Sequence, residues 1–229
     1  MFKYTKMDRA MKERYFIFPE VLPPLTNFKL SSSIRRNQII HDGFYEKNII
    51  FTHIPKAAGS SIGISILGHD RVGHYPLSYL REIDLNFFYN SLKFCISRDP
   101  YTRVVSAFNY LKKGGKGKWD EKILIKHKLN EITFEEFVLE IINDEIIYSI
   151  IHLTPQYEFI TDNDGNILTD HIIKMENLEF EIEVINKHLG EKIKLEKHNK
   201  SGAERPKDND SVKDKIREIY QKDYEIFGY

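Results

Sequence analysis

The chain has 229 residues, enough for one α/β domain with a hydrophobic core, and 41% of them are hydrophobic. Its 34 basic and 34 acidic residues balance, which argues against a general electrostatic attraction to nucleic acid or to a membrane surface. No apolar run reaches the roughly 18 residues of a membrane span, the N-terminus lacks the apolar block of a signal peptide, and the single cysteine, Cys95, allows no internal disulfide, as suits a reducing compartment.

The first predicted elements are an arm and a strand. Residues 1–47 mix charged and aromatic side chains without a clear period, so we expect an arm that packs on a domain formed by residues 48–229. A buried strand over 49–51 stops at Pro55, and an apolar helix over 60–68 follows. A strand, a glycine turn and a helix N-terminus together form an anion cradle, because the first helical N–H groups have no partner in the helix and the helix dipole adds positive potential.

The loop between this strand and helix carries a full positive charge on Lys56. Backbone N–H groups of Gly59, Ser60 and Ser61 complete the predicted phosphate site. An ordinary NTP-binding loop places its lysine directly after the second glycine, whereas Lys56 precedes Gly59 and therefore approaches from the strand side. A strand–turn–helix with a surface lysine and no ligand is the alternative reading of this segment.

A second anion site is predicted after the second strand. A helix over 76–90 leads to a strand over 92–97 that ends in Arg98, where an ATPase or GTPase would usually have an acidic residue that helps to hold Mg²⁺. Asp99 is a good N-cap for the next helix. A guanidinium here favours bidentate phosphate binding, so the two sites predict one ligand with phosphates at both ends of a nucleoside. A surface arginine and an ordinary helix serine, Ser106, remain the alternative.

The rest of the chain alternates helices with a third strand. The expected elements are a Gly/Lys loop over 112–118, a short helix over 120–128, a capped helix over 133–142, an ambiguous stretch over 144–160, a hairpin turn over 163–166, a strand over 172–174, a helix over 178–189 and a last helix over 212–220. Strands separated by helices predict an α/β fold, a P-loop-like three-layer sandwich with a central, mainly parallel sheet and helices on both faces.

These motifs carry a family resemblance. Residues 53–61, His-Ile-Pro-Lys-Ala-Ala-Gly-Ser-Ser, resemble the 5′-phosphosulfate loop of the sulfotransferases that use 3′-phosphoadenosine 5′-phosphosulfate (PAPS). Residues 98–108 resemble the 3′-phosphate motif of that family, and residues 73–76 resemble its catalytic-histidine segment. The likeness is closest to carbohydrate sulfotransferases, the branch with the heparan 2-O and chondroitin/dermatan enzymes, and it extends from about residue 48 to the C-terminus.

The resemblance implies in-line transfer of a sulfonate group from PAPS to a hydroxyl of a carbohydrate. It makes His74 the base, with His152 as its rival, and it gives Lys56 the leaving phosphate. Arg103 would reach the ligand or pair with Glu176. A late loop over 198–202 would close over the nucleotide, and no metal is expected. The residues expected to hold PAPS are Lys56, Ala57, Ala58, Gly59, Ser60, Ser61, Arg98 and Ser106.

The acceptor is the least determined part of this prediction. Lysines between 112 and 128 surround Trp119 and could grip an acidic glycan or glycolipid, and the alternative is a solvated surface loop. A P-loop nucleotide kinase or other phosphotransferase remains a second reading, and a non-catalytic nucleotide- or glycan-binding module a third. Animal members of the family are commonly anchored in the Golgi; because this sequence shows no anchor, we expect a cytoplasmic protein of bacterial or viral origin, and leave its oligomeric state open.

Overall fold

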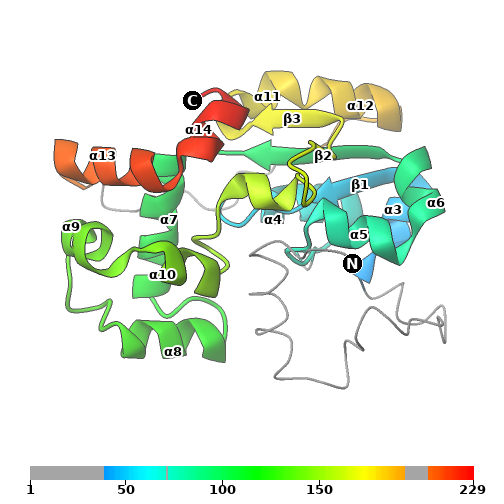
Figure 1. The fold of residues 1–229 in the computed structure, drawn as a ribbon. Helices are drawn as coiled ribbons and strands as arrows, with labels where there is room; N and C mark the ends of the chain where they lie inside the picture. The colour runs from blue at the N-terminus through cyan, green and yellow to red at the C-terminus, as the bar shows by residue number, and fades with distance from the viewer. Residues whose placement is uncertain (1–38, 71, 194–205) are drawn as a thin grey trace.

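Three parallel strands form the sheet of the computed structural model, which describes residues 39–70, 72–193 and 206–229. They are β1 (Ile49–Thr52), β2 (Leu92–Ser97) and β3 (His171–Lys174), in the order β1-β2-β3 (Figure 1). Within this part of the chain the sheet is wholly parallel, with Phe51 opposite Phe94 and Cys95 opposite Ile172. The predicted α/β fold class is confirmed.

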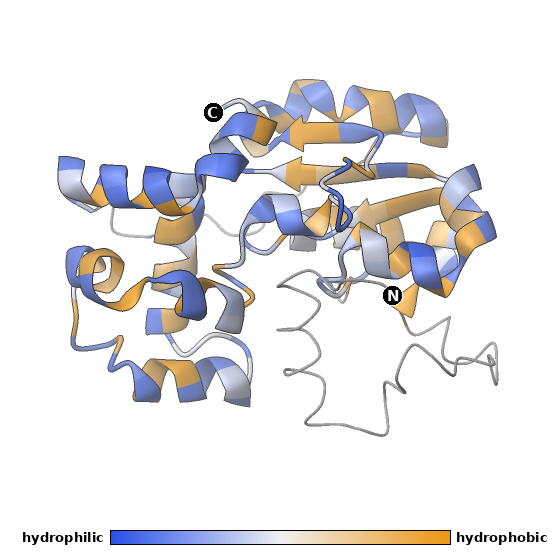
Figure 2. Cartoon of the chain, viewed as in Figure 1, coloured by the Kyte–Doolittle hydropathy of each residue, from blue (hydrophilic) through white to orange (hydrophobic). Residues whose placement is uncertain are grey.

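Both faces of the sheet are covered. All of β1 is buried, and β2 is buried from Lys93 to Ser97. Because successive side chains of a strand point to opposite faces, such continuous burial requires packing on both sides, and Figure 2 shows the hydrophobic strands lying among helices that expose hydrophilic residues. Cys95 lies fully buried in β2, where burial raises the pKa of its thiol to about 12.

The described helices surround this sheet and extend to one side of it. They are α3 (Asp42–Lys47), α4 (Gly59–Leu67), α5 (Leu77–Ile83), α6 (Leu85–Asn90), α7 (Pro100–Lys112), α8 (Lys118–Lys126), α9 (Phe134–Glu136), α10 (Asp144–Ser149), α11 (Leu178–Glu181), α12 (Glu183–Leu189), α13 (Asp210–Ile219) and α14 (Gln221–Phe227), with a π-helical turn η2 (Phe137–Ile141) and the 3₁₀ turns η3 (Gln156–Phe159) and η4 (Met175–Asn177). None of the described helices is long and apolar enough to cross a membrane.

Side-chain caps explain several boundaries, including one that the sequence prediction missed. The single helix expected over 76–90 is two helices, because Asp84 has extended backbone and its carboxylate accepts a hydrogen bond from Phe87 N at 2.9 Å, as the N-cap of α6. The predicted caps at Asp99 and Thr133 are confirmed. The predicted turn over 163–166 is confirmed by the antiparallel bridge on either side of it.

A second hydrophobic cluster lies beside the sheet, formed by α7, α8, α9, η2, α10 and α13 at the left of Figure 1. Its centre includes Phe108, Phe137 and Ile216, all well buried. The long helix α7 starts at the carboxyl end of β2 and continues into this cluster, so it connects the second cluster directly to the end of a strand.

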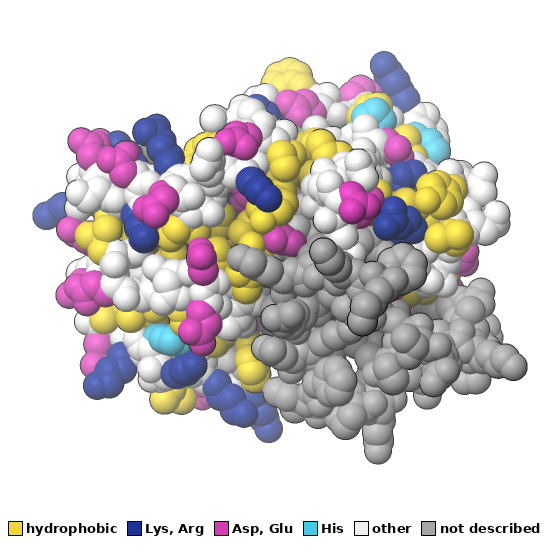
Figure 3. Space-filling view, viewed as in Figure 1, with side chains coloured by type: hydrophobic (Ala, Val, Ile, Leu, Met, Phe, Trp, Pro, Cys, Tyr) yellow, Lys and Arg dark blue, Asp and Glu magenta, His cyan; other side chains and the backbone are white. Residues whose placement is uncertain are grey.

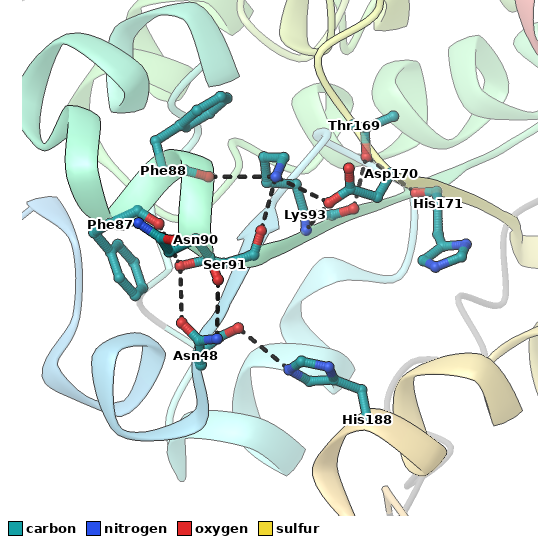
Figure 4. A network of polar contacts seen from close by, with 10 residues as sticks. All are labelled: Asn48, Phe87, Phe88, Asn90, Ser91, Lys93, Thr169, Asp170, His171 and His188. Carbon is teal, nitrogen blue, oxygen red and sulfur yellow. Dashed lines mark hydrogen bonds and ion pairs between the residues drawn. The ribbon is translucent and has the colours of Figure 1, made fainter.

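The amino end of the sheet is closed by polar contacts (Figure 4). Lys93 Nζ donates hydrogen bonds to Ser91 O at 2.7 Å and Phe88 O at 3.3 Å, and forms an ion pair with Asp170 at 3.0 Å. His188 Nε2 lies 3.2 Å from the carbonyl oxygen of Asn48. These polar groups are bonded within the protein, whereas ligands bind at the carboxyl ends of the strands in open α/β sheets.

Two predicted segments fall partly or wholly outside the described residues. Of the arm over 1–47, residues 39–47 are described, and Ile40 and Phe44 of this stretch pack into the core around the sheet. The remaining arm residues, 1–38, and the late loop over 198–202 lie outside the described part of the chain.

Candidate active site

The loop after β1 has an unusual backbone. Lys56 has φ 68° and Ala58 φ 58°, conformations that residues with a side chain adopt rarely and at some cost in energy. Positive φ on alternate residues is typical of loops whose N–H groups converge on an anion. Ala58 is the N-cap of α4 and provides no side-chain cap, while Ser61 N already donates to Ala58 O at 3.1 Å. At the start of α4, the N–H groups of Gly59 and Ser60 are therefore the better candidates to donate to a ligand.

The loop packs directly against an imidazole. A Cβ at Gly59 would lie 1.7 Å from Cδ2 of His53, so only glycine fits there. His53 is 8% exposed, and burial, with smaller contributions from His74, His152 and Lys56, lowers its pKa well below 6.5. The ring is therefore neutral near pH 7, and it supports the loop without adding charge.

Lys56 and Arg98 come from different strand ends and meet. Arg98 Nη1 donates a hydrogen bond to Lys56 O at 3.2 Å, and Lys56 Nζ lies 4.0 Å from the ring centroid of Tyr110. Burial, together with the charge of Arg98, lowers the pKa of Lys56 to about 8, and burial also lowers the pKa of Arg98. Two partly buried cations near each other disfavour each other's charged form, and a negatively charged ligand offsets this, so the arrangement is suited to phosphate or sulfate groups.

The backbone of Arg98 is held by the side chain of Gln156. The side-chain amide of Gln156 accepts from Arg98 N at 3.0 Å and donates to Arg98 O at 2.8 Å. Asp223 in turn accepts from the backbone N–H groups of Gln156 and Tyr157, at 2.8 and 2.9 Å. Arg98 Nε also donates to Thr102 Oγ1 at 3.1 Å. The end of β2 is therefore held in place by η3, which is in turn bonded to α14.

Three histidines lie together beside this loop. The ring of His74 lies 4.2 Å from that of His53 and 6.2 Å from that of His152, between centroids. Nδ1 of His74 is 2.9 Å from His53 O. Since a carbonyl oxygen can only accept, Nδ1 carries the proton, and in the neutral ring Nε2 is the basic nitrogen. Gly73, with φ 77°, gives the tight turn before His74.

His152 has a different environment. It is 8% exposed, and its Nε2 lies 3.2 Å from Asp120 Oδ1. Burial would raise the pKa of Asp120, but hydrogen bonds from His152 and Tyr110 outweigh this and lower it to about 2. The carboxylate is therefore ionised at neutral pH, and Nε2 of His152 carries the proton that it accepts. The other ring nitrogen, Nδ1, is buried.

The sequence prediction did not select Tyr110 and Asp120. Tyr110 lies one helical turn after Ser106 on α7, and its position i+4 from a predicted binding residue was a signal that could have been used. Asp120 stands among lysines in the sequence, where it was counted only as a charge. Nothing local in the sequence indicates that α8 turns its carboxylate toward His152.

Arg103, another predicted site residue, makes structural contacts. Arg103 is fully buried, and its guanidinium donates to the carbonyl oxygens of His152, Leu153 and Thr154. Glu176 instead accepts from Asp99 N and Tyr229 OH, so the predicted alternative in which Arg103 pairs with Glu176 is wrong.

Ser106 and Trp119, two other predicted site residues, lie on α7 and α8. Ser106 is partly buried on α7, one turn beyond Thr102, and Trp119 on α8 is 36% exposed. Among the described residues, no group of three or more His, Cys, Asp and Glu side chains is placed to hold a metal ion.

Comparisons with known proteins identify the family. The sequence model described as Sulfotransferase family matches residues 69–229, more than half of the chain. The match begins after the loop over 53–61 and includes His74, Arg98 and His152. No curated protein and no solved structure matches the chain. The parallel sheet, the cationic site at its carboxyl edge and this match agree, and the chain belongs to the sulfotransferase family.

Proposed function

We propose that this sulfotransferase takes its sulfonate group from PAPS and transfers it to a hydroxyl of a carbohydrate acceptor. The observation that carries the proposal is the contact between the two predicted anion sites, in which Arg98 Nη1 donates to Lys56 O. PAPS has a phosphosulfate at one end of its nucleoside and a phosphate at the other. The residues present fit both groups, with Lys56 and the N–H groups of Gly59 and Ser60 for the 5′ end and Arg98 with Ser106 for the 3′ end.

The reaction is a direct displacement. The acceptor oxygen forms a bond to sulfur while the bond from sulfur to the 5′-phosphate oxygen breaks, so negative charge grows on the leaving phosphate. Lys56 and the fixed N–H donors of the loop stabilise that charge, and in other enzymes one such donor contributes roughly 3–4 kcal/mol. The ring of Tyr110 stabilises the ammonium group of Lys56 by a cation–π contact.

A phosphotransferase is the competing function, and nucleotide binding separates the two. Calorimetry should detect 3′,5′-diphosphoadenosine bound more tightly than ATP and without a requirement for Mg²⁺. Lys56→Ala and Arg98→Ala should each weaken this binding by about tenfold or more, the effect of losing a charged hydrogen bond. Lys187→Ala, an exposed lysine of α12, is the control and should leave the affinity unchanged.

Other outcomes would overturn the proposal. Tight binding of ATP that requires Mg²⁺ would favour a phosphotransferase. Normal binding of 3′,5′-diphosphoadenosine with no release of sulfonate from labelled PAPS, across a panel of glycan acceptors, would favour a non-catalytic binding module.

His74 is the better candidate for the base that takes the acceptor proton. Its Nδ1–H is bonded to His53 O, which leaves Nε2 as the basic nitrogen, and the residue is partly exposed. In His152 the two ring nitrogens have the opposite roles. Nε2 carries the proton and faces Asp120, and the basic nitrogen Nδ1 is buried. A base must reach the proton that it removes, so the geometry favours His74.

Rates measured with labelled PAPS and desulfated heparan or chondroitin chains test this assignment. His74→Ala should lower kcat by about a hundredfold or more and abolish the acidic limb of the pH–rate profile, as expected for loss of a general base. His152→Ala should retain that limb. Full activity of the His74 variant would end the assignment.

The acceptor is proposed to be an acidic glycan or glycolipid. Lys118, Lys122 and Lys126 are exposed on α8, and Figure 3 shows basic side chains over this helix at the lower left of the molecule. Trp119 on the same helix offers an aromatic face on which a sugar ring could stack. Acceptor KM values that rise with salt in the parent enzyme, and less steeply in Lys→Ala variants, would support this contact.

A further inference from the structure

Asp120 is the centre of a buried polar network that joins three segments. Its Oδ2 accepts from Tyr110 OH on α7 at 2.8 Å and from Lys116 N in the loop before α8 at 3.3 Å. Its Oδ1 faces His152 Nε2 at 3.2 Å. Lys116 N also donates to Tyr110 OH at 2.8 Å, which closes the network. Asp120 is 6% exposed, and its carboxylate thus contacts side chains of α7 and of the stretch that contains His152.

The network extends to the reacting groups through two of its members. The Tyr110 ring that donates to Asp120 also carries the ammonium group of Lys56, 4.0 Å from its centroid. The ring of His152 packs edge-on against the same tyrosine, with centroids 4.7 Å apart, and lies beside His74. Tyr110 therefore contacts Asp120, Lys56 and His152, so a shift of Asp120 would move the tyrosine against both Lys56 and His152.

The loop before α8 is shaped around this carboxylate. Gly115 has φ 62°, and a Cβ built on it would lie 2.3 Å from Cβ and 2.4 Å from Oδ2 of Asp120. Among the described residues, no ion pair of Asp120 with a lysine or arginine is found, since Lys116 Nζ pairs with Asp70. The carboxylate is instead held by hydrogen bonds from Tyr110 OH, Lys116 N and His152 Nε2, so its position and the positions of these donors depend on one another.

We propose, on the basis of the function proposed above, that Asp120 is a positioning residue for sulfonate transfer, which holds Lys56 through Tyr110 and orients His152 through Nε2. It acts through these neighbours and does not touch the donor. Because Asp120 bonds the hydroxyl of the tyrosine that contacts Lys56 Nζ, its negative charge also favours the charged form of Lys56.

The charged groups around Lys56 set the direction of the pH effect. Burial lowers the pKa of Lys56 most. Arg98 from the end of β2 and Lys116 from the loop before α8 lower it further, the neutral ring of His53 adds no charge, and Asp120 raises it. The result is a pKa of about 8, so Lys56 is mostly protonated at neutral pH. Without the charge of Asp120, the pKa falls further, and Lys56 loses its proton at a lower pH.

The test compares Asp120→Asn with the parent chain and two controls. Glu121→Gln removes the same charge from the same turn of α8 at an exposed position, and Asp120→Glu retains the charge. The first measurement is the pH dependence of acetylation of Lys56 by acetic anhydride, followed by peptide mass spectrometry, which reports its protonation without any nucleotide. The second is calorimetry with 3′,5′-diphosphoadenosine at about pH 6.5 and about pH 8.5.

The expected result is specific to a positioning role. In Asp120→Asn the acetylation midpoint of Lys56 should move to lower pH, and affinity for 3′,5′-diphosphoadenosine should fall more at the higher pH, by about tenfold for each unit of pKa lost. Glu121→Gln should match the parent, and Asp120→Glu should recover the parent midpoint.

An unchanged midpoint in Asp120→Asn, in a variant with native circular dichroism, overturns the proposal, as does an affinity loss that is equal at both pH values. If the variant does not fold, Gly115→Ala, which displaces the carboxylate but retains it, gives the second comparison: a parent midpoint there overturns the proposal. Failure of the parent chain to bind 3′,5′-diphosphoadenosine would instead contradict the proposed function, and the acetylation experiment would still decide the role of Asp120.

Discussion

At the scale of single residues, the candidate site is a place where stability is given up. Lys56 has a left-handed backbone, is partly buried and lies beside Arg98. Each of these features costs energy in the absence of a ligand, and such costs concentrate at functional sites. Tyr110 and Asp120 reduce the cost by supporting the ammonium group, but the pKa of Lys56 is still lowered from 10.5 to about 8.

This lowered pKa predicts a variant that is more stable than the parent. The unfolded chain binds the Lys56 proton more tightly than the folded one, so the cost is fully present below about pH 8 and disappears as the pH approaches 10.5. Lys56→Met should therefore raise the free energy of unfolding near pH 7 by about 1–3 kcal/mol, and by less as the pH rises through that range. Urea denaturation at several pH values measures this, with Lys187→Met as control. Equal stability of parent and variant at all pH values would contradict the lowered pKa.

At the scale of secondary-structure elements, local caps and tertiary contacts determine different boundaries. The start of α7 follows from Asp99 and Pro100, which any chain with this sequence would use to begin a helix. The stretch from Ile150 to Gln156 has no helical or strand period, yet it is buried throughout. Its carbonyl groups bond to Arg103 and Tyr220, and it places both His152 and Gln156 at the site. Irregular backbone is tolerated here because distant side chains satisfy it.

At the scale of the whole molecule, two hydrophobic clusters must be held in a fixed relation, because the site takes residues from both. His53 and Lys56 lie in the loop after β1, whereas Tyr110 and Asp120 belong to the helices α7 and α8 beside the sheet. The irregular stretch contributes to both clusters, Ile151 to the first and Leu153 to the second. Arg103 fixes this stretch: it starts from α7, donates to the carbonyls of the stretch, and lies 5.5 Å from the ring centroid of Tyr220 at the end of α13.

Arg103 is therefore predicted to be structural. Arg103→Met should lower the free energy of unfolding by about 2–3 kcal/mol, because it leaves buried carbonyl groups without their donor. Arg217→Met, at an exposed position of α13, should change it little. Denaturation curves of the two variants decide this. If Arg103→Met is as stable as the parent but loses affinity for 3′,5′-diphosphoadenosine, the residue contacts the ligand after all.

The sequence by itself determined the features that depend on neighbours along the chain. The strand–loop–helix around Lys56, the strand ending in Arg98, the caps at Asp99 and Thr133, and the α/β class follow from local steric and hydrogen-bonding preferences, which act within a few residues. Only the tertiary structure decided which side chains meet. It brought Arg98 to Lys56, gathered the three histidines and placed Asp120 behind Tyr110, because contacts between residues far apart in the chain depend on packing of the two clusters and leave no periodic signal in the sequence.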